Sequence, residues 1–315
     1  MKVAHRLALA LVLASGCAHG RDAALARIVA APYTPQSIGP DTRVMLVAGG
    51  DDVANFAEEV VRQRKLWRGA GLSENAIACY WAKPKGRALR RDRRQYRRLA
   101  PALAGCGEAS PAVVLADLAE LAQAAPPWLY LYVSGHGVPS LDEAPGTWTL
   151  PPEERAWLRQ PALALDGDPA LRVQETAALL DARRSGTPDA ALLFSPATLR
   201  AALARLPDAT EKLVVLQGCF SGGFVVGPDA ITHAHRVTAL TAAAADRPSF
   251  GCGSGNRTTF WGGALQHELE HRVRFGDTPP ALEWHAVHED VAKRVTRLER
   301  ALGQQPSRPQ FRRSR

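Results

Sequence analysis

Two absences narrow what this sequence encodes. Beyond residue 17, no stretch is apolar over the length that a bilayer-spanning helix needs, so the body of the chain is not expected to be an integral membrane domain. The five cysteines include no C-x-x-C pair, which argues against a cysteine-ligated metal site. The roughly 300 residues after the leader are enough for one large α/β domain or two small ones.

The first 17 residues have the order of a bacterial export signal. Two basic residues precede a short apolar run over 7–13, and small residues then lead to Cys17. This order predicts a signal peptide over 1–17, and its final cysteine resembles the bacterial lipobox, whose cysteine becomes acylated. We expect lipidation at Cys17, a tether over 18–40 and a lipid-anchored protein of the bacterial cell envelope, facing the periplasm from the outer membrane. An ordinary cleaved signal peptide is the alternative.

The formal net charge of +8 comes in large part from one segment. Nine lysines and arginines lie between Lys83 and Arg98. In a cytosolic protein, such a segment would suggest a nucleic-acid partner. In an exported protein it indicates a solvated helix face, or a patch that meets anionic lipid or an acidic substrate. We expect the solvated face and no nucleic-acid partner.

Three cysteines remain once Cys17 is assigned to the leader and Cys219 to a motif described below. An oxidising periplasm permits one disulfide among Cys79, Cys106 and Cys252. We predict that Cys79 pairs with Cys106, which leaves Cys252 unpaired.

Apolar runs and helical patterns alternate along the body of the chain. The predicted strands are 43–48, 76–81, 128–133, 213–217 and 237–242. The predicted helices run from 53 to about 69, from 111 to about 125, from 195 to 206, from 259 to 272 and from 280 to 302. Residues 141–190, rich in Pro, Asp and Gly, are expected to form an insertion. The alternation predicts one α/β domain over 41–315, with a parallel-rich sheet covered on both faces.

Two of these strands end in a reactive residue flanked by glycines. The strand 128–133 runs into His136, and the strand 213–217 delivers Cys219. Because ligands of such sheets bind at the carboxyl ends of the strands, both residues are expected in one site. A thiolate nucleophile needs a base to remove its proton, and an imidazole is the usual choice. From composition alone, a buried structural cysteine is the competing interpretation.

The same two segments carry a family resemblance. Residues 132–137 and 218–222 resemble the His-Gly and Cys-x-Ser-Gly motifs of the caspase and legumain clan. Residues 241–262 resemble the segment that follows the nucleophile in legumain-type cysteine peptidases. The similarity extends from about residue 43 to about residue 310, with a gap over the insertion.

This resemblance implies a caspase-like three-layer α/β/α sandwich with a mostly parallel central sheet. It also implies a cysteine endopeptidase that hydrolyses peptide or protein substrates through a thioester acyl-enzyme. Cys219 would be the nucleophile and His136 the general base and acid, and the main chains of Gly137 and Cys219 would stabilise the oxyanion. The resemblance implies no metal and no organic cofactor.

The specificity pocket departs from the family pattern. Eukaryotic legumains carry an Arg-His pair where this chain has Ala57-Glu58, and a Glu where Gln217 precedes the nucleophile. Gly263 stands in place of an Asp, whereas the pocket serine is kept as Ser249. We predict Ser249, Glu58 and Gln217 as substrate-binding residues and an altered preference for the P1 residue. The charge of Glu58 would favour a basic one.

Three alternatives compete with this interpretation. The run from His267 to His271 matches H-E-x-x-H, the zinc-peptidase motif, and Glu289 or Asp290 is a candidate third ligand. The charged inner residue Glu270 indicates instead a solvated helix with surface histidines. A non-catalytic binding module would keep only the fold. A transamidase or ligase would resolve the same acyl-enzyme with an amine in place of water.

Overall fold

A computed structural model describes residues 36–37, 41–50, 52–83, 93–140, 147–165, 173–253, 255–273 and 281–314. The signal peptide, Cys17, most of the tether and most of the basic segment lie outside these residues. Among the described helices, none combines the length and the apolarity that crossing a membrane requires.

A seven-stranded sheet forms the centre of the described residues. Its strands, in order across the sheet, are β11 (Gln310–Arg313), β9 (Val237–Thr241), β8 (Glu211–Gln217), β5 (Trp128–Ser134), β2 (Thr42–Ala48), β3 (Ile77–Trp81) and β4 (Gly107–Glu108). Neighbouring strands are parallel except for β11, which runs antiparallel to β9. The predicted mostly parallel sheet is confirmed. The C-terminal strand β11 was not predicted.

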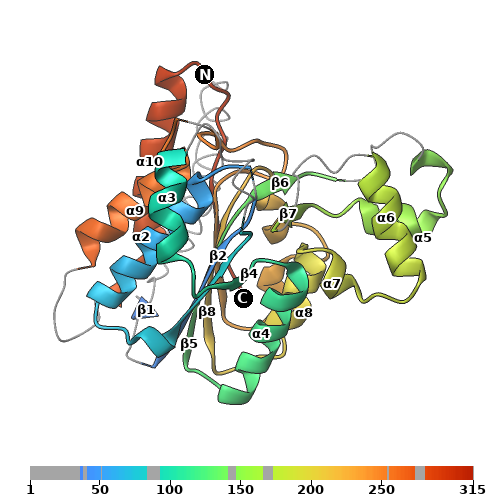
Figure 1. Cartoon of the computed structure of the whole chain (residues 1–315), viewed down its shortest axis with the longest axis horizontal. Coiled ribbons are helices and arrows are strands. Elements are labelled where there is room, and N and C mark those ends of the chain that lie inside the picture. The colour runs from blue at the N-terminus through green and yellow to red at the C-terminus, as the bar shows by residue number, and fades with distance from the viewer. Residues whose placement is uncertain are drawn as a thin grey trace, which may run out of the picture. The chain divides into compact units, whose positions relative to one another are not determined.

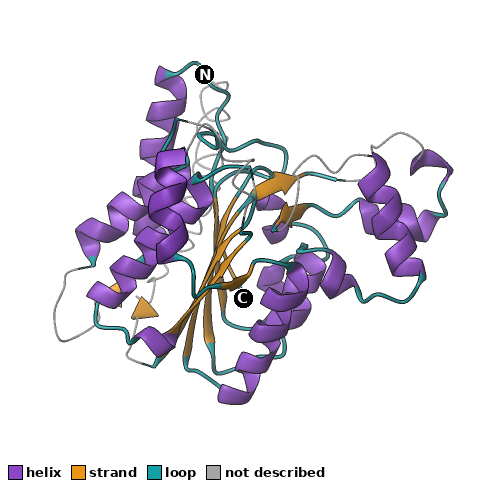
Figure 2. Ribbon diagram, viewed as in Figure 1, coloured by secondary structure: helices purple, strands orange, loops and turns teal. Residues whose placement is uncertain are grey.

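Helices cover both faces of this sheet (Figure 1). On one face lie α2 (Asn55–Gly69), α3 (Arg93–Ala102), α9 (Phe260–Arg272) and α10 (Trp284–Ala301), and on the other lie α4 (Pro111–Ala124) and α8 (Pro196–Leu203). Figure 2 shows the strands enclosed between these two layers of helices. The predicted three-layer α/β/α sandwich is therefore confirmed. A separate two-residue ladder joins β1 (Gln36–Ser37) to β10 (Ala281–Leu282).

The central strand β5 shows how one strand serves both layers. Successive side chains of a strand point to opposite faces, and Leu131 belongs to the apolar cluster on the α4 and α8 side. On the opposite face, Tyr130 and Tyr132 donate their hydroxyls to Gln63 and Glu59 of α2, at 3.0 and 2.8 Å. One face of the strand is thus purely apolar, while the other carries buried polar groups toward the end where the reactive residues follow.

Side-chain caps fix where the helices begin. At α8 the hydroxyl of Ser195 accepts from the N–H of Thr198 at 3.4 Å, while Thr198 Oγ1 accepts from the N–H of Ser195 at 3.0 Å. This reciprocal pair, followed by Pro196, confirms the predicted helix start, and such a cap stabilises a helix by about 1 kcal/mol. The hydroxyls of Ser110 and Thr259 each accept one main-chain N–H at the starts of α4 and α9, without the reciprocal bond.

The predicted insertion contains a small helical subdomain. The chain enters it through β6 (His136–Val138), which pairs antiparallel with β7 (Ala162–Ala164), and the subdomain includes α5 (Pro152–Leu158), α6 (Val173–Arg184) and α7 (Asp189–Leu192). Trp157, Leu158, Leu180 and Leu193 form their own buried cluster. In Figure 1, β6 and β7 extend from the sheet toward α5 and α6. The strand at the entrance of the subdomain carries His136 itself.

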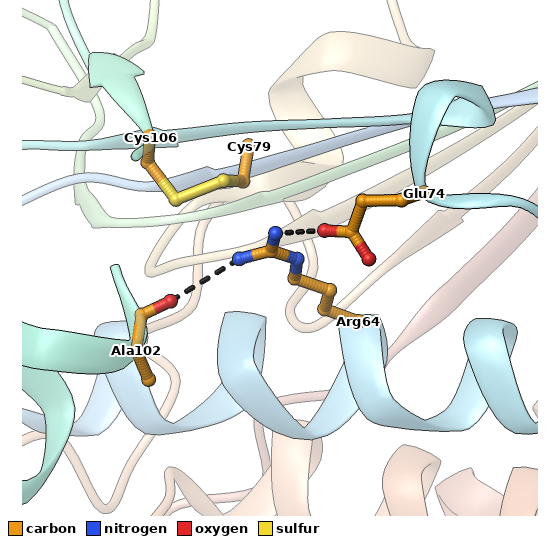
Figure 3. The surroundings of a disulfide bond; sticks show 5 residues. All are labelled: Arg64, Glu74, Cys79, Ala102 and Cys106. Atoms are coloured by element: carbon orange, nitrogen blue, oxygen red, sulfur yellow. Dashed lines mark hydrogen bonds and ion pairs between the residues drawn. A yellow bond between two sulfur atoms is a disulfide. The ribbon is translucent and has the colours of Figure 1, made fainter. Parts of the chain in front are cut away.

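The predicted disulfide between Cys79 and Cys106 is present (Figure 3). It joins β3 to the segment before β4, across a sequence separation of 27 residues. Beside it, Arg64 of α2 is paired with Glu74 and donates to the carbonyl of Ala102 at 3.1 Å. The covalent link and the arginine therefore tie this edge of the sheet to the helical layer.

Candidate active site

The two reactive segments leave the sheet side by side. β5 and β8 are adjacent parallel strands, and their last residues, Ser134 and Gln217, are paired in register. The N–H of Gly135 extends this ladder by donating to the carbonyl of Gln217 at 3.0 Å. His136 and Cys219 each follow two residues after the end of their strand, so the sheet delivers both to the same edge.

Gly137 lies directly against the main chain of Cys219. A β-carbon at position 137 would lie 1.6 Å from the carbonyl oxygen of Cys219 and 2.9 Å from its amide nitrogen. A β-carbon on Gly218 would similarly lie 2.8 Å from the carbonyl oxygen of Gly135. Only glycine is accommodated at such distances, and the two loops therefore contact each other through their main chains.

The thiol of Cys219 is held by the main chain of Ser249. Its sulfur accepts from the N–H of Ser249 and lies within donating distance of the carbonyl of the same residue, each at 3.3 Å. Burial raises the pKa of the Cys219 thiol, and the N–H of Ser249 opposes that rise. The next residue, Phe220, has a φ of 57°, a left-handed conformation that is uncommon for a residue other than glycine.

Ser221 gives the Cys-x-Ser-Gly spacing a structural role. Its fully buried hydroxyl oxygen accepts from the N–H groups of Ala242 and Ala243, at 3.1 and 3.2 Å, where β9 ends. A β-carbon on Gly222 would lie 2.6 Å from the amide nitrogen of Ala245. The turn that carries the nucleophile is therefore fixed to the end of the neighbouring strand.

The imidazole of His136 is oriented by Asp52. Its Nε2 lies 2.8 Å from Oδ1 of Asp52, the ring of Phe56 meets it edge-on at 5.0 Å between centroids, and the Cys252 side chain lies within hydrogen-bonding reach. Burial lowers the pKa of His136, but the hydrogen bonds and charges of Asp52 and Cys252 outweigh burial and raise that pKa to about 9. These contacts therefore favour the protonated form of the ring.

The structure brings the segments of His136 and Cys219 together without joining their side chains. Among the described residues, the polar partners of the ring are Asp52 and Cys252, whereas those of the thiol are the main-chain groups of Ser249. Proton transfer from the thiol to the ring therefore requires Cys219 to turn away from Ser249. Such loose geometry is common when no substrate is bound.

The predicted specificity residue Glu58 is bound by three arginines. Its carboxylate accepts from Arg62 at 3.2 Å and from Arg257 at 3.0 Å, and it is also paired with Arg98. Burial would raise the pKa of Glu58, but these arginines outweigh burial and lower it. Since both carboxylate oxygens are occupied, this geometry gives no support to an attraction between Glu58 and a basic P1 residue.

Gln217 and Ser249, the other two predicted substrate-binding residues, do lie next to the nucleophile. The Gln217 side chain is buried, with its Oε1 at 2.9 Å from the hydroxyl of Ser134. Ser249 contacts Cys219 through its main chain rather than its side chain. A role of either side chain in choosing the substrate stays a prediction.

The buried carboxyl group of Glu59, on α2, connects β5 to the start of α9. Its Oε1 accepts from the N–H and the hydroxyl of Thr259, both at 2.7 Å, and its Oε2 lies 2.8 Å from the hydroxyl of Tyr132 and 2.6 Å from that of Ser134. The single proton of Ser134 cannot serve both Glu59 and Gln217. A proton on Glu59 satisfies every atom, because it is donated to Ser134, which then donates to Gln217. Burial raises the pKa of Glu59, which favours this protonated form.

The H-E-x-x-H run lies on α9. The rings of His267 and His271 are 4.3 Å apart, but Asp290, a candidate third ligand, is paired with Arg272 at 2.5 Å. In the described ranges of the chain, no three His, Cys, Asp or Glu residues are grouped to hold a metal ion. The zinc-peptidase alternative therefore lacks a third ligand from these residues.

Sequence reasoning missed Asp52 and Cys252. Asp52 follows the end of β2, which lies beside β5 in the sheet. A predicted strand order would therefore have placed Asp52 beside His136. Cys252 lies three residues after Ser249, in the segment that holds the nucleophile. The sequence analysis considered Cys252 only as a possible disulfide partner and did not place it near the active site.

A family comparison supports the resemblance in the C-terminal part of the chain. Residues 187–310 match the model of the Peptidase C13 family. This is the legumain family. The matched segment includes Cys219 and Ser249 and begins after His136, so it supports a cysteine peptidase by its nucleophile region.

Two solved structures resemble the chain at low sequence identity. A protein from Geobacter sulfurreducens has 11% identity and a TM-score of 0.48, over 87% of this chain and 93% of its own. Caspase-1 from Spodoptera frugiperda has 11% identity and a TM-score of 0.43, over 89% of each chain. Similarity this low carries no argument about activity. No curated protein matches the sequence.

Proposed function

We propose that the protein is a cysteine endopeptidase that cleaves peptide or protein substrates through Cys219 and His136. The observation that carries this proposal is the main-chain contact between Gly137 and Cys219, beside an imidazole ring oriented by Asp52. A nucleophile, a base and a third group that orients the base form the arrangement that nucleophilic catalysis uses. The match of residues 187–310 to a peptidase family supports the same activity.

In the proposed reaction, the neutral form of His136 first takes the proton of Cys219, and the thiolate attacks the scissile carbonyl. His136 then gives this proton to the leaving amine, and a thioester between Cys219 and the acyl part of the substrate remains. Water, deprotonated by the same ring, attacks the thioester, releases the acid and restores the thiol. Asp52 keeps the ring oriented and stabilises its charged form in each step.

The oxyanion of each tetrahedral intermediate needs N–H donors that are fixed before the reaction. The main chains of Gly137 and Cys219 are the candidates, because they contact each other at the nucleophile and Gly137 has no side chain to come between them. The left-handed Phe220 and the hydroxyl of Ser221 hold the Cys219 main chain in place. This preorganisation is the main contribution of the fold to the proposed chemistry.

The test is cleavage of a mixed peptide library by the purified protein. Cleavage should disappear in Cys219→Ala, persist with a metal chelator, and persist in His267→Ala, which removes one half of the H-E-x-x-H motif. Cleavage that survives in Cys219→Ala and stops with chelator would refute the proposal. Products joined to an added amine, in place of free acids, would identify a transamidase on the same residues. If the wild-type protein cleaves none of the peptides, the result would favour the non-catalytic binding module.

We also propose that acylation of Cys17 anchors the protein to the periplasmic side of the bacterial outer membrane. The support is the sequence of residues 1–17 alone. Cell fractionation tests it: the wild-type protein should sediment with membranes, and a Cys17→Ala variant should not mature to the acylated form. Equal membrane association and equal mass of the two mature proteins would refute the anchor.

A further inference from the structure

The loop that carries Cys252 is fixed at both of its ends to the candidate active site. On one side, Ser249 contacts the sulfur of Cys219 through its N–H and its carbonyl, each at 3.3 Å. On the other side, the N–H of Gly253 donates to Oδ1 of Asn55 at 3.0 Å. Asn55 precedes Phe56, whose ring packs against His136. The loop therefore spans from the nucleophile to the base, and Cys252 lies between these two anchors.

The Cys252 side chain faces the same two groups. It lies within hydrogen-bonding reach of the His136 ring, and it adds to the rise that burial causes in the pKa of the Cys219 thiol. Both cysteines are free thiols and both are partly accessible. The remaining described cysteines, Cys79 and Cys106, are already paired with each other. Cys219 and Cys252 are thus two reduced thiols that share one imidazole.

Two glycines in left-handed conformations flank Cys252. Gly251 and Gly253 flank it on either side, with φ values of +93° and +150°. Such conformations are readily open to glycine alone. A disulfide between the two residues requires the Cys252 side chain to leave the ring and the Cys219 side chain to turn from Ser249, because each thiol has its own partner in the reduced protein. A disulfide needs the two Cα atoms within about 7 Å.

We propose that Cys219 and Cys252 form an oxidation-sensitive dithiol, in which a hydroperoxide converts the nucleophile into one half of a reversible disulfide. Its consequence for activity rests on the proposed peptidase function, whereas the disulfide itself does not. The first step is attack of the Cys219 thiolate on the peroxide oxygen, which gives a sulfenic acid at Cys219 and releases an alcohol, or water from hydrogen peroxide. Cys252 then attacks the sulfenic sulfur, the S–S bond forms and water leaves.

The ring of His136 can serve both steps. A thiolate is the form that reacts with a peroxide, and a neutral imidazole can generate it by taking the thiol proton. The ring touches Cys252 and is the proposed proton acceptor for Cys219, so it can assist either thiol. The disulfide would spare Cys219 from sulfinic and sulfonic acids, which thiols do not reverse. A thiol reductant returns both residues to their resting state.

The experiment treats the purified wild-type protein with hydrogen peroxide and maps its cysteines by mass spectrometry without reduction. We expect a peptide pair linked through Cys219 and Cys252, lighter by two hydrogens than the sum of its parts, which disappears on reduction. In Cys252→Ser, the same treatment should drive Cys219 to sulfinic and sulfonic acids. Cys219→Ser should leave Cys252 without this link.

Activity provides the second readout if the peptidase assay succeeds. The wild-type protein should lose at least about tenfold in rate on oxidation and recover with a dithiol reductant, and Cys252→Ser should lose activity without recovery. A wild-type protein whose Cys219 is overoxidised while Cys252 stays a free thiol would overturn the proposal, as would recovery of Cys252→Ser equal to that of the wild type. Because the peptide map needs no substrate, a failure of the proposed peptidase leaves the test of the dithiol intact.

Discussion

Replacing Asp52 by Asn tests whether this carboxylate sets the protonation of the catalytic base. The substitution keeps an oxygen that can accept from His136 Nε2 but removes the negative charge. The pKa of His136 is raised from 6.5 to about 9, and Asp52 is the first of the groups that raise it. Part of the rise belongs to Cys252, and the Asp52 side chain is 42% exposed, so solvent screens its charge. We expect Asp52→Asn to lower this pKa by about one unit, or about 1.4 kcal/mol.

The assay is the pH dependence of kcat/KM on the best peptide from the library, from about pH 5 to about pH 10. If His136 must lose its proton before it can accept that of Cys219, activity rises with pH through the pKa of the ring. The acid limb of the profile should therefore move to lower pH in Asp52→Asn. The maximal rate should fall because the ring is less firmly oriented. Asp208→Asn, which removes an exposed carboxylate before the amino end of β8, is the matched control for net charge and should leave the limb in place.

The stability of the protein offers an independent readout of the same charge. His136 has a higher pKa in the folded state than its ordinary value of 6.5. Its contribution to the free energy of unfolding is therefore complete below pH 6.5 and is lost as the pH rises through about 9. Urea midpoints across this window should fall less steeply in Asp52→Asn than in the wild type. An acid limb that stays in place or moves to higher pH, together with an unchanged slope of stability, would refute the role of Asp52.

Three further predictions follow from contacts away from this pair. Gly137→Ala should reduce kcat/KM to background because its β-carbon would collide with the main chain of Cys219, whereas Gly105→Ala, where nothing lies within 4 Å, should retain activity. Because burial raises the pKa of Glu59, the folded protein keeps the proton on Glu59 at pH values where the unfolded chain has released it. The free energy of unfolding therefore falls as the pH rises above about 4.5. Urea titrations should therefore show Glu59→Gln gaining stability relative to the wild type as the pH rises, and a constant difference would contradict a protonated Glu59. Removing the disulfide with Cys79→Ser should lower the free energy of unfolding by about 3–4 kcal/mol, because the unfolded chain gains the conformational entropy of the opened loop. A loss below about 1 kcal/mol would show that the crosslink hardly restricts the unfolded chain.

The strands and helices that carry the site follow strong local patterns, and for this reason the sequence predicts them. β5 and β8 are largely apolar because both faces of the strands are buried, and such runs are recognisable without knowing their neighbours. The start of α8 at Ser195 is likewise local, since the cap and the following Pro196 lie within four residues. The antiparallel strands β6, β7 and β11 were missed because their three or four residues carry no periodicity of their own.

The residues that contact His136 and Glu58 were not predicted from the sequence, for a different reason. Asp52 meets His136 across 84 positions, and Cys252 meets the same ring from a loop with no distinctive pattern. Glu58 was interpreted from its place after the first strand, but its carboxylate is bound by Arg98 and Arg257, which lie 40 and 199 positions away. Contacts of this kind depend on strand order and helix packing, and neither is encoded in a local motif.

The site combines a fixed main chain with reactive side chains that contact separate partners. The main chain of the nucleophile turn is fixed by Gly137, the left-handed Phe220 and the hydroxyl of Ser221. The thiol of Cys219, in contrast, rests on Ser249, while the ring of His136 contacts Asp52 and Cys252. Catalysis and oxidation would then differ only in which groups meet: the ring with Cys219 in the first case, and Cys219 with Cys252 in the second. Because neither change requires the sheet to move, the same preorganised loop can serve a peptide substrate and a peroxide.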